Sequence, residues 1–219
     1  MKIQYLFIII FLLISIKQAD AQFAFGGKTG LTFSTVRYKV ANTNKTMQPF
    51  MKTKLGNQLG LTGEYYFVKG LAVQADLQYI GKGFKYAFQY SDGKQRFDFS
   101  QINIAGKVSF YEEDNITISA YAAPFASFWI YGMKTETNYK FNEIKKDNYN
   151  FADTSYSNNY NRWDAGVAAG LELKLTQTWN RKLVFDIHYE YSLISNDLDK
   201  VDGMLNRVLF LGVGYLFNQ

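Results

Sequence analysis

The chain has 219 residues, of which 24 are Lys or Arg and 19 are Asp or Glu, so its formal net charge is +5. It contains 19 Phe, 17 Tyr, 17 Gly, two Pro and no Cys. This composition excludes a disulfide scaffold, a cysteine-ligated metal site and a disordered chain. The mild positive charge is spread along the sequence and indicates no nucleic-acid partner.

The first 21 residues are predicted to be a secretory signal peptide. Lys2 precedes an apolar run at 3–14, and Ala19-Asp20-Ala21 has the small-x-small form of a cleavage site. Cleavage would leave residues 22–219 as one mature domain. Because no later segment has eighteen consecutive apolar residues, a mature chain that enters a membrane must do so as a β-barrel.

Eight segments of the mature chain are predicted to be β-strands, and no segment after the signal peptide has a helical period. In most of them apolar and polar residues alternate with period two, so that one face of each strand is apolar. The alternation is less clean at 101–110, in the last segment, and at 116–131, which carries Pro124. The eight segments are 23–34, 55–67, 71–79, 101–110, 116–131, 163–175, 183–193 and 205–217.

The connections between these segments alternate between long and short. Tight turns are predicted at 68–70, 112–115 and 177–181, and long polar loops at 36–53, 81–96, 132–160 and 195–204. This order is typical of an all-β fold, an eight-stranded antiparallel up-and-down barrel with both termini at one end and the long loops at the other.

The apolar faces are predicted to point outward, toward lipid. They hold about five large residues per strand, which is too much bulk for the interior of an eight-stranded barrel. Glycines lie on the opposite, polar face, where they relieve crowding inside a narrow barrel. We therefore expect a transmembrane barrel in the lipid of a bacterial outer membrane, with periplasmic termini and extracellular long loops. The alternative is a secreted barrel that binds a small molecule.

Three regions of the mature chain resemble known patterns. Residues 212–217 resemble the Gly-x-x-aromatic-x-Phe signal read by the barrel-insertion machinery, with Gly212, Tyr215 and Phe217 at its fixed positions. Residues 25–34 and 77–83 are similar to the Gly-x-Lys-x-Gly-x-Asn-x-Ser and Leu-x-Tyr-x-x-Lys-Gly motifs of the PorT-type outer-membrane β-barrel family of Bacteroidetes. The resemblance implies an eight-stranded outer-membrane barrel. Since most members have no assigned activity, it implies no specific task.

The predicted inner face carries many charged residues. His188 lies between Asp186 and Glu190 on this face, which suits a general base or a weak metal site but lacks a visible nucleophile or second His. We expect ion pairs that rigidify the barrel, with an enzyme built around His188 and the inner carboxylates as the alternative. The predicted network comprises Lys28, Glu64, Asp76, Lys107, Glu172, Lys174, Asp186, His188 and Glu190.

The predicted loop at 132–160 is rich in Tyr and Asn, a composition found in adaptable binding surfaces. A hydrated loop without a ligand is the simpler interpretation. The sequence favours a non-enzymatic protein without a cofactor, having a structural, adhesion or envelope-assembly role. Its expected partners are the barrel-insertion machinery and, through this loop, an extracellular or envelope protein.

Overall fold

The computed structural model describes residues 23–39, 41–148, 161–177, 181–194 and 203–218. The predicted signal peptide lies outside these residues. Among the described residues, no helix is long and apolar enough to span a bilayer. The long strands are β1 (Phe23–Tyr38), β3 (Lys54–Val68), β4 (Leu71–Ala87), β5 (Ser91–Glu113), β6 (Ile116–Asn138), β8 (Trp163–Gln177), β9 (Arg181–Ser192) and β10 (Met204–Asn218). The short elements are α2 (Ala41–Met47), η1 (Gln48–Phe50), β2 (Met51–Lys52) and β7 (Glu143–Asn148).

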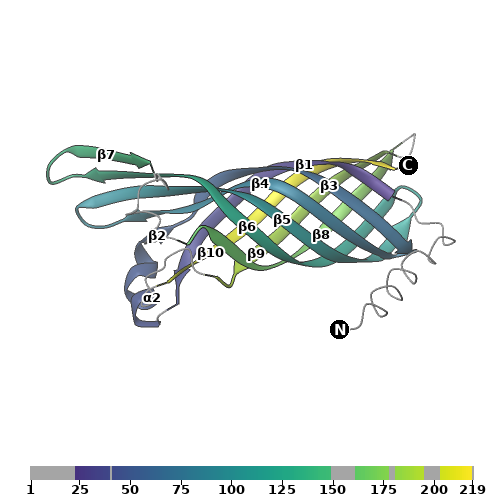
Figure 1. Cartoon of the computed structure of the whole chain (residues 1–219), viewed down its shortest axis with the longest axis horizontal. Coiled ribbons are helices and arrows are strands. Elements are labelled where there is room, and N and C mark those ends of the chain that lie inside the picture. The colour runs from purple at the N-terminus through teal and green to yellow at the C-terminus, as the bar shows by residue number, and fades with distance from the viewer. Residues whose placement is uncertain (1–22, 40, 149–160, 178–180, 195–202, 219) are drawn as a thin grey trace, which may run out of the picture.

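All strands belong to one antiparallel sheet, which confirms the predicted all-β, up-and-down arrangement. Each long strand pairs with the next long strand along the chain, and β10 pairs with β1 from Ala24–Asn218 to Tyr38–Met204. We call these eight strands, which wind around a common axis in Figure 1, the strand ring. The sheet has ten strands rather than the predicted eight, because β2 and β7 pair with the far ends of β4 and β6.

The predicted loop at 81–96 is wrong, because most of it is strand. β4 continues to Ala87 and β5 begins at Ser91, and the hairpin between them is paired as far as Ala87–Asp92. The predicted loop at 132–160 is also partly strand, since β6 runs to Asn138 and β7 pairs back onto it. Figure 1 shows both hairpins projecting beyond the strand ring, at the end opposite the C-terminus.

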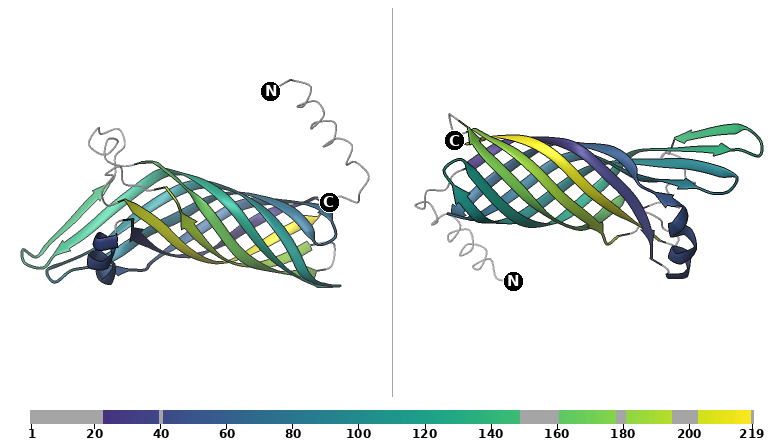
Figure 2. Two further views of the ribbon diagram at one scale, coloured as in Figure 1. Left: turned by 90° about the horizontal axis from the view of Figure 1, so that it is seen from below. Right: turned by 180° about the vertical axis from the view of Figure 1, so that it is seen from behind.

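The predicted loop at 36–53 contains a helix that the sequence analysis did not predict. The helix α2 has seven residues, too few to display a clear helical period in the sequence. η1 and β2 follow it directly, and β2 pairs with β4 at Met51–Tyr86. The two views of Figure 2 place α2 at the same end of the molecule as the projecting hairpins.

The polarity of the strand ring is inverted relative to a water-soluble protein. Large apolar side chains face outward, and Leu61 and Leu59 are 69% and 62% exposed. The alternate positions, which carry most of the charged residues of these strands, are buried inside. Pro124 lies on the outer face, where the β5–β6 ladder skips from Asn103–Phe125 to Gly106–Ala122, because proline has no N–H to donate.

Candidate functional site

All nine charged residues of the predicted network are buried inside the strand ring. Neighbouring and opposite strands supply them, so that side chains far apart in the sequence meet at the axis. Lys28 comes from β1, Glu64 from β3, Asp76 from β4, Lys107 from β5, Glu172 and Lys174 from β8, and Asp186, His188 and Glu190 from β9.

Three lysines and two glutamates form the cluster nearest the chain termini, which we call the Lys107 cluster. Lys107 Nζ lies 2.5 Å from Glu64 Oε1 and also donates a hydrogen bond to Glu172. Lys174 Nζ lies 2.5 Å from Glu64 Oε2 and 3.2 Å from Glu172 Oε1. Lys28 Nζ lies 2.7 Å from Glu172 Oε2. Each glutamate therefore bridges lysines of different strands, an arrangement that offsets the cost of burying these charges.

His188 lies beside this cluster and is 4% exposed. Its Nδ1 is 2.9 Å from Tyr121 Oη and 3.3 Å from Asp186 Oδ1, and its Nε2 is 3.7 Å from Glu190 Oε1. The imidazole packs on Phe210 with ring centroids 4.6 Å apart. Among the described residues, its hydrogen-bond partners are the Tyr121 phenol and the Asp186 carboxylate. A serine or threonine hydroxyl, which the imidazole could activate as a nucleophile, is not among them.

A second cluster surrounds Lys82, which the sequence analysis assigned to a loop and therefore missed. Lys82 Nζ lies 3.2 Å from Asp164 Oδ2 and 3.0 Å from Glu190 Oε2. Its ammonium also lies 4.5 Å from the centre of the Phe125 ring. Gln101 donates a hydrogen bond of 2.5 Å to Glu190, which helps to fix this carboxylate beside Lys82. The sequence signal that could have revealed Lys82 is the period-two alternation of 71–79, which, if continued, places Lys82 on the same face as Asp76 and Gln78.

An apolar cluster closes the inside of the ring toward the hairpins. Phe97 and Trp129 lie edge to face, with ring centroids 4.7 Å apart. Trp129 is fully buried and its indole N–H donates to the Tyr131 carbonyl at 2.6 Å. The cluster comprises Val36, Ile80, Phe84, Tyr86, Phe97, Phe99, Trp129 and Val208.

The residues of the predicted insertion signal lie on β10, next to β1. The side chains of Tyr215 and Phe217 face outward, and their rings lie 5.1 Å apart. Phe217 also packs on Phe25 of β1 at 5.7 Å, and Gly212 is paired with Gly30. These aromatic residues belong to an outward-facing group at the terminal end of the ring.

The projecting hairpins are held together by polar contacts and expose large apolar side chains. Tyr139 Oη donates a hydrogen bond of 2.7 Å to Asp92, which raises the pKa of the Tyr139 phenol. Glu136 lies 2.9 Å from Lys134, and hydrogen bonding to this ammonium lowers the pKa of the Glu136 carboxyl. Phe141, at the tip of the second hairpin, is 65% exposed. The rest of the predicted loop, 149–160, lies outside the described residues.

The inner carboxylates do not form a metal site in the described part of the chain. No group of three His, Cys, Asp or Glu side chains among the described residues could hold a metal ion. Lysines occupy the positions around Glu64 and Glu172 where a cation would otherwise bind. Ion pairing is therefore the chemistry that this interior supports.

The family comparison matches residues 17–198 to a family model described as outer membrane protein beta-barrel domain. No curated protein matches the chain. Among solved structures, the outer membrane protease OmpT from Escherichia coli is similar, with 8% identity and a TM-score of 0.50 over 92% of this chain and 98% of that chain.

Two further structures are similar at lower TM-scores. A major outer membrane protein from Thermus thermophilus has 12% identity and a TM-score of 0.48, with 92% of this chain and 100% of that chain covered. Ail, the attachment invasion locus protein of Yersinia pestis, in complex with the heparin analogue sucrose octasulfate, has 16% identity and a TM-score of 0.42. That match covers 89% of this chain and 99% of Ail.

Proposed function

This chain belongs to the outer-membrane β-barrel family, and on that basis we propose that the strand ring is an eight-stranded transmembrane barrel with a structural or adhesion role at the cell surface. In this proposal the barrel conducts no solutes, catalyses no reaction and works through the hairpins beyond its rim. The termini face the periplasm and the hairpins face the exterior.

The outer surface supports a position within a bilayer. Exposed aliphatic side chains such as Leu61 and Ile104 form the middle of the outward face. Aromatic residues flank this band at both ends, as in the aromatic girdles of transmembrane barrels. Phe25 and Phe217 pack together at the terminal end, and Phe128 and Trp163 pack at the other with ring centroids 5.1 Å apart. A secreted carrier would instead turn these side chains toward a ligand in its interior.

The observation that carries the proposal is the filled interior. From the termini toward the hairpins, the axis is occupied by the Lys107 cluster, by His188, by the Lys82 cluster and by the apolar cluster around Trp129. An interior of eight strands is just wide enough for side chains to fill, whereas open channels use about 16 to 18 strands. Water and solutes therefore have no continuous path.

An enzyme built around His188 is the second candidate. The similarity to OmpT shows the fold alone, so the argument depends on the geometry of His188. The imidazole is enclosed by Tyr121, Asp186 and Phe210, and a substrate would have to displace these side chains to reach it. This enclosure favours a structural role.

The hairpins are the surface that we assign to a partner protein. They extend β4, β5 and β6 beyond the ring and expose Phe141, Ile144 and Tyr90 to solvent. Exposed aromatic side chains on a rigid scaffold are typical of protein-binding surfaces. The motifs at 25–34 and 77–83 further support membership of the PorT-type group of Bacteroidetes, in which an envelope-assembly or secretion role is the specific form of this proposal.

Planar-bilayer recording of the purified, folded protein tests the proposal. We expect no large, steady single-channel conductance at neutral pH. Cells that carry the protein should bind fewer envelope or surface partners when 139–148 is replaced by a short Gly-Ser turn. A stable large-conductance pore from the folded monomer would refute the closed interior, and unchanged binding after the replacement would refute the role of the hairpin.

A further inference from the structure

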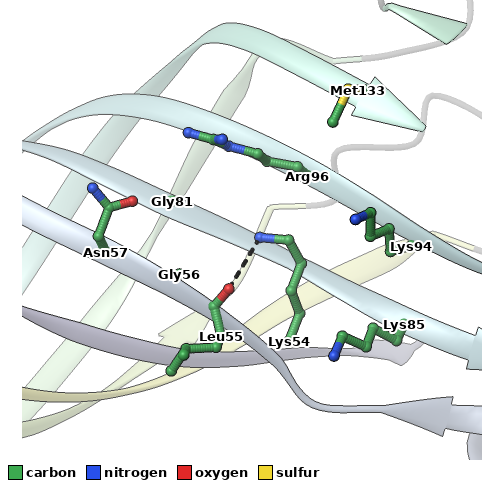
Figure 3. Close-up of a pocket in the computed structure, with 9 residues that line it drawn as sticks. All are labelled: Lys54, Leu55, Gly56, Asn57, Gly81, Lys85, Lys94, Arg96 and Met133. Carbon is green, nitrogen blue, oxygen red and sulfur yellow. Dashed lines mark hydrogen bonds between the residues drawn. The ribbon is translucent and has the colours of Figure 1, made fainter. Parts of the chain in front are cut away.

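The wall of the strand ring opens between β3 and β4. The β3–β4 ladder ends at the pair Gln58–Ile80, although both strands continue beyond it. Residues 54–57 of β3 stay paired with β1, whereas residues 81–87 of β4 stay paired with β5. The separation is local, because β2, which directly precedes β3, pairs with β4 again at Lys52–Lys85. A hollow of about 280 Å³ lies in the gap between these two ladders (Figure 3).

Specific hydrogen bonds fix this separation. Thr32 Oγ1 of β1 donates to the Gly81 carbonyl at 2.6 Å, and Ser34 Oγ donates to the Gly83 carbonyl at 2.8 Å. Both hydroxyls reach past β3 to carbonyls of β4 that the ended ladder leaves unpaired. Gly56 makes this possible, because a Cβ at that position would lie 2.5 Å from Thr32 Oγ1 and would also meet the Gly81 backbone. These contacts therefore fix the positions of β3 and β4 on the two sides of the hollow.

Four cationic side chains line the hollow: Lys54 from β3, Lys85 from β4, and Lys94 and Arg96 from β5. Arg96 Nε lies 2.9 Å from Asp98, and its Nη2 donates to Tyr79 Oη at 3.0 Å.

The three lysines lack such partners. Within the described part of the chain, none of Lys54, Lys85 and Lys94 forms an ion pair with a carboxylate, in contrast to the lysines of the interior. Lys54 is 8% exposed, and its Nζ reaches the Leu55 carbonyl at 3.5 Å. The carboxylate of Asp98 lies near Lys54 but is paired with Arg96, so the buried ammonium beside three other cations has no ion-pair partner of its own. The site thus has the charge and the unused donors to bind an anion.

The hollow also has an apolar border. Leu55 and Met133 line it, and Leu55 is exposed on the same outward face as Leu59 and Leu61. An anion with attached acyl chains could therefore place its head among the cations and its chains along this face. Lys and Arg together are the usual protein ligands of phosphate, since Arg forms paired hydrogen bonds and Lys supplies a mobile point charge.

We propose that the hollow lined by Lys54, Lys85, Lys94 and Arg96 binds a phosphate group, either on a lipid headgroup of the surrounding leaflet or on a free phosphorylated solute. The bound phosphate neutralises Lys54 and bridges β3 to the β4–β5 hairpin where their ladder has ended. This site is separate from the closed interior, so it does not depend on the absence of conductance.

The test uses the full mature chain folded in micelles of an uncharged detergent. One arm titrates inorganic phosphate by calorimetry, and the other adds phosphatidic acid to the micelles and follows its phosphorus resonance. We expect saturable binding in at least one arm, and a dissociation constant at least about tenfold higher in Lys85→Gln/Lys94→Gln, because the variant removes two cations that attract the phosphate. Lys145→Gln/Lys146→Gln, which removes the same charge from β7, is the matched control and should bind as the unmodified protein does.

The pattern of the two arms identifies the source of the phosphate. Binding in both arms means that the phosphate alone suffices, whereas binding to phosphatidic acid alone identifies a lipid headgroup. Because Lys54 forms no ion pair that its removal would break, and Asp98 keeps Arg96 as its partner, Lys54→Met should fold and still lose binding. Absence of binding in both arms, or an equal loss in the β7 control, would overturn the proposal.

Discussion

Lys82 on β4 lies 3.2 Å from Asp164 on β8, and both side chains are fully buried. Because β4 and β8 are not neighbours in the sheet, this ion pair connects opposite walls of the strand ring. Glu190 of β9 joins it at 3.0 Å from the same ammonium. The interior is therefore braced across its width by charge, at a level between the Lys107 cluster and the apolar cluster.

Removal of Lys82 should destabilise the barrel strongly. Lys82→Met leaves Asp164 and Glu190 as buried carboxylates without their lysine, and breaking a buried pair in this way costs about 3–5 kcal/mol. Urea unfolding in lipid bilayers, followed by tryptophan fluorescence, measures the loss. The triple variant Lys82→Met/Asp164→Asn/Glu190→Gln should recover much of it, because no charge then lacks a partner. Lys145→Met on the exposed β7 is the control and should have little effect.

The two faces of β9 should differ in how much they tolerate a lysine. Ile187 is 45% exposed in the middle of the outward apolar face, and a lysine there costs about 2–4 kcal/mol against lipid. The adjacent His188 points inward between Asp186 and Glu190, which can pair with an ammonium. Ile187→Lys should therefore lower the free energy of unfolding in lipid more than His188→Lys. Equal losses, or the reverse order, would contradict the assigned orientation.

The strands were predictable where the environment of the two faces differs most. From 55 to 67, outward residues meet lipid and inward residues meet the polar interior, so the sequence alternates plainly. Toward the hairpins the pattern is reversed, since Phe84 and Phe97 point inward whereas Lys85 and Lys94 face the solvent. Because the apolar residues change faces here, the alternation of 71–79 does not continue on one apolar face, and 81–96 was predicted to be a loop.

The members of the inner network were predictable as a set, but their partners were not. The alternation of β8 and β9 places Glu172 and Asp186 on the inner face from sequence alone. That Glu172 bridges Lys28, Lys107 and Lys174 depends on the stagger of strands around the ring, which no local pattern encodes. Lys82 was missed for a different reason, because the predicted strand ended before reaching it.

Gly56 should be far less tolerant of a methyl group than Gly106. A Cβ at Gly56 meets the Gly81 backbone and Thr32 Oγ1, whereas a Cβ at Gly106 meets nothing within 4 Å. Gly56→Ala should therefore lose about 1–3 kcal/mol through overpacking and the weakened Thr32–Gly81 hydrogen bond. Gly106→Ala should be neutral or stabilising by about 0.5 kcal/mol, because alanine loses less backbone entropy on folding. Urea unfolding of both variants in the same lipid gives the comparison, and equal losses would contradict the close approach of β1, β3 and β4.

Opening the apolar end of the interior should produce a small leak that favours cations. Phe97→Ala/Trp129→Ala removes the two rings that meet edge to face above the charged clusters, while the ion pairs below them remain. The leak should be cation-selective, because the charged clusters in the described part of the interior hold six carboxylates against four lysines, with His188 beside them. The carboxylates are Glu64, Asp76, Asp164, Glu172, Asp186 and Glu190, and the lysines are Lys28, Lys82, Lys107 and Lys174.

Planar-bilayer recording under a salt gradient measures both the size and the sign of this leak. Heat-modified mobility on a gel first shows that the double variant is folded, since truncation of two buried aromatic rings costs about 3–5 kcal/mol each. Phe128→Ala, which removes an aromatic ring from the outer face of the same strand, is the matched control and should remain closed. An anion-selective leak would contradict the charge balance assigned to the interior. A large conductance in the Phe128→Ala control would show that the apolar cluster does not close the barrel.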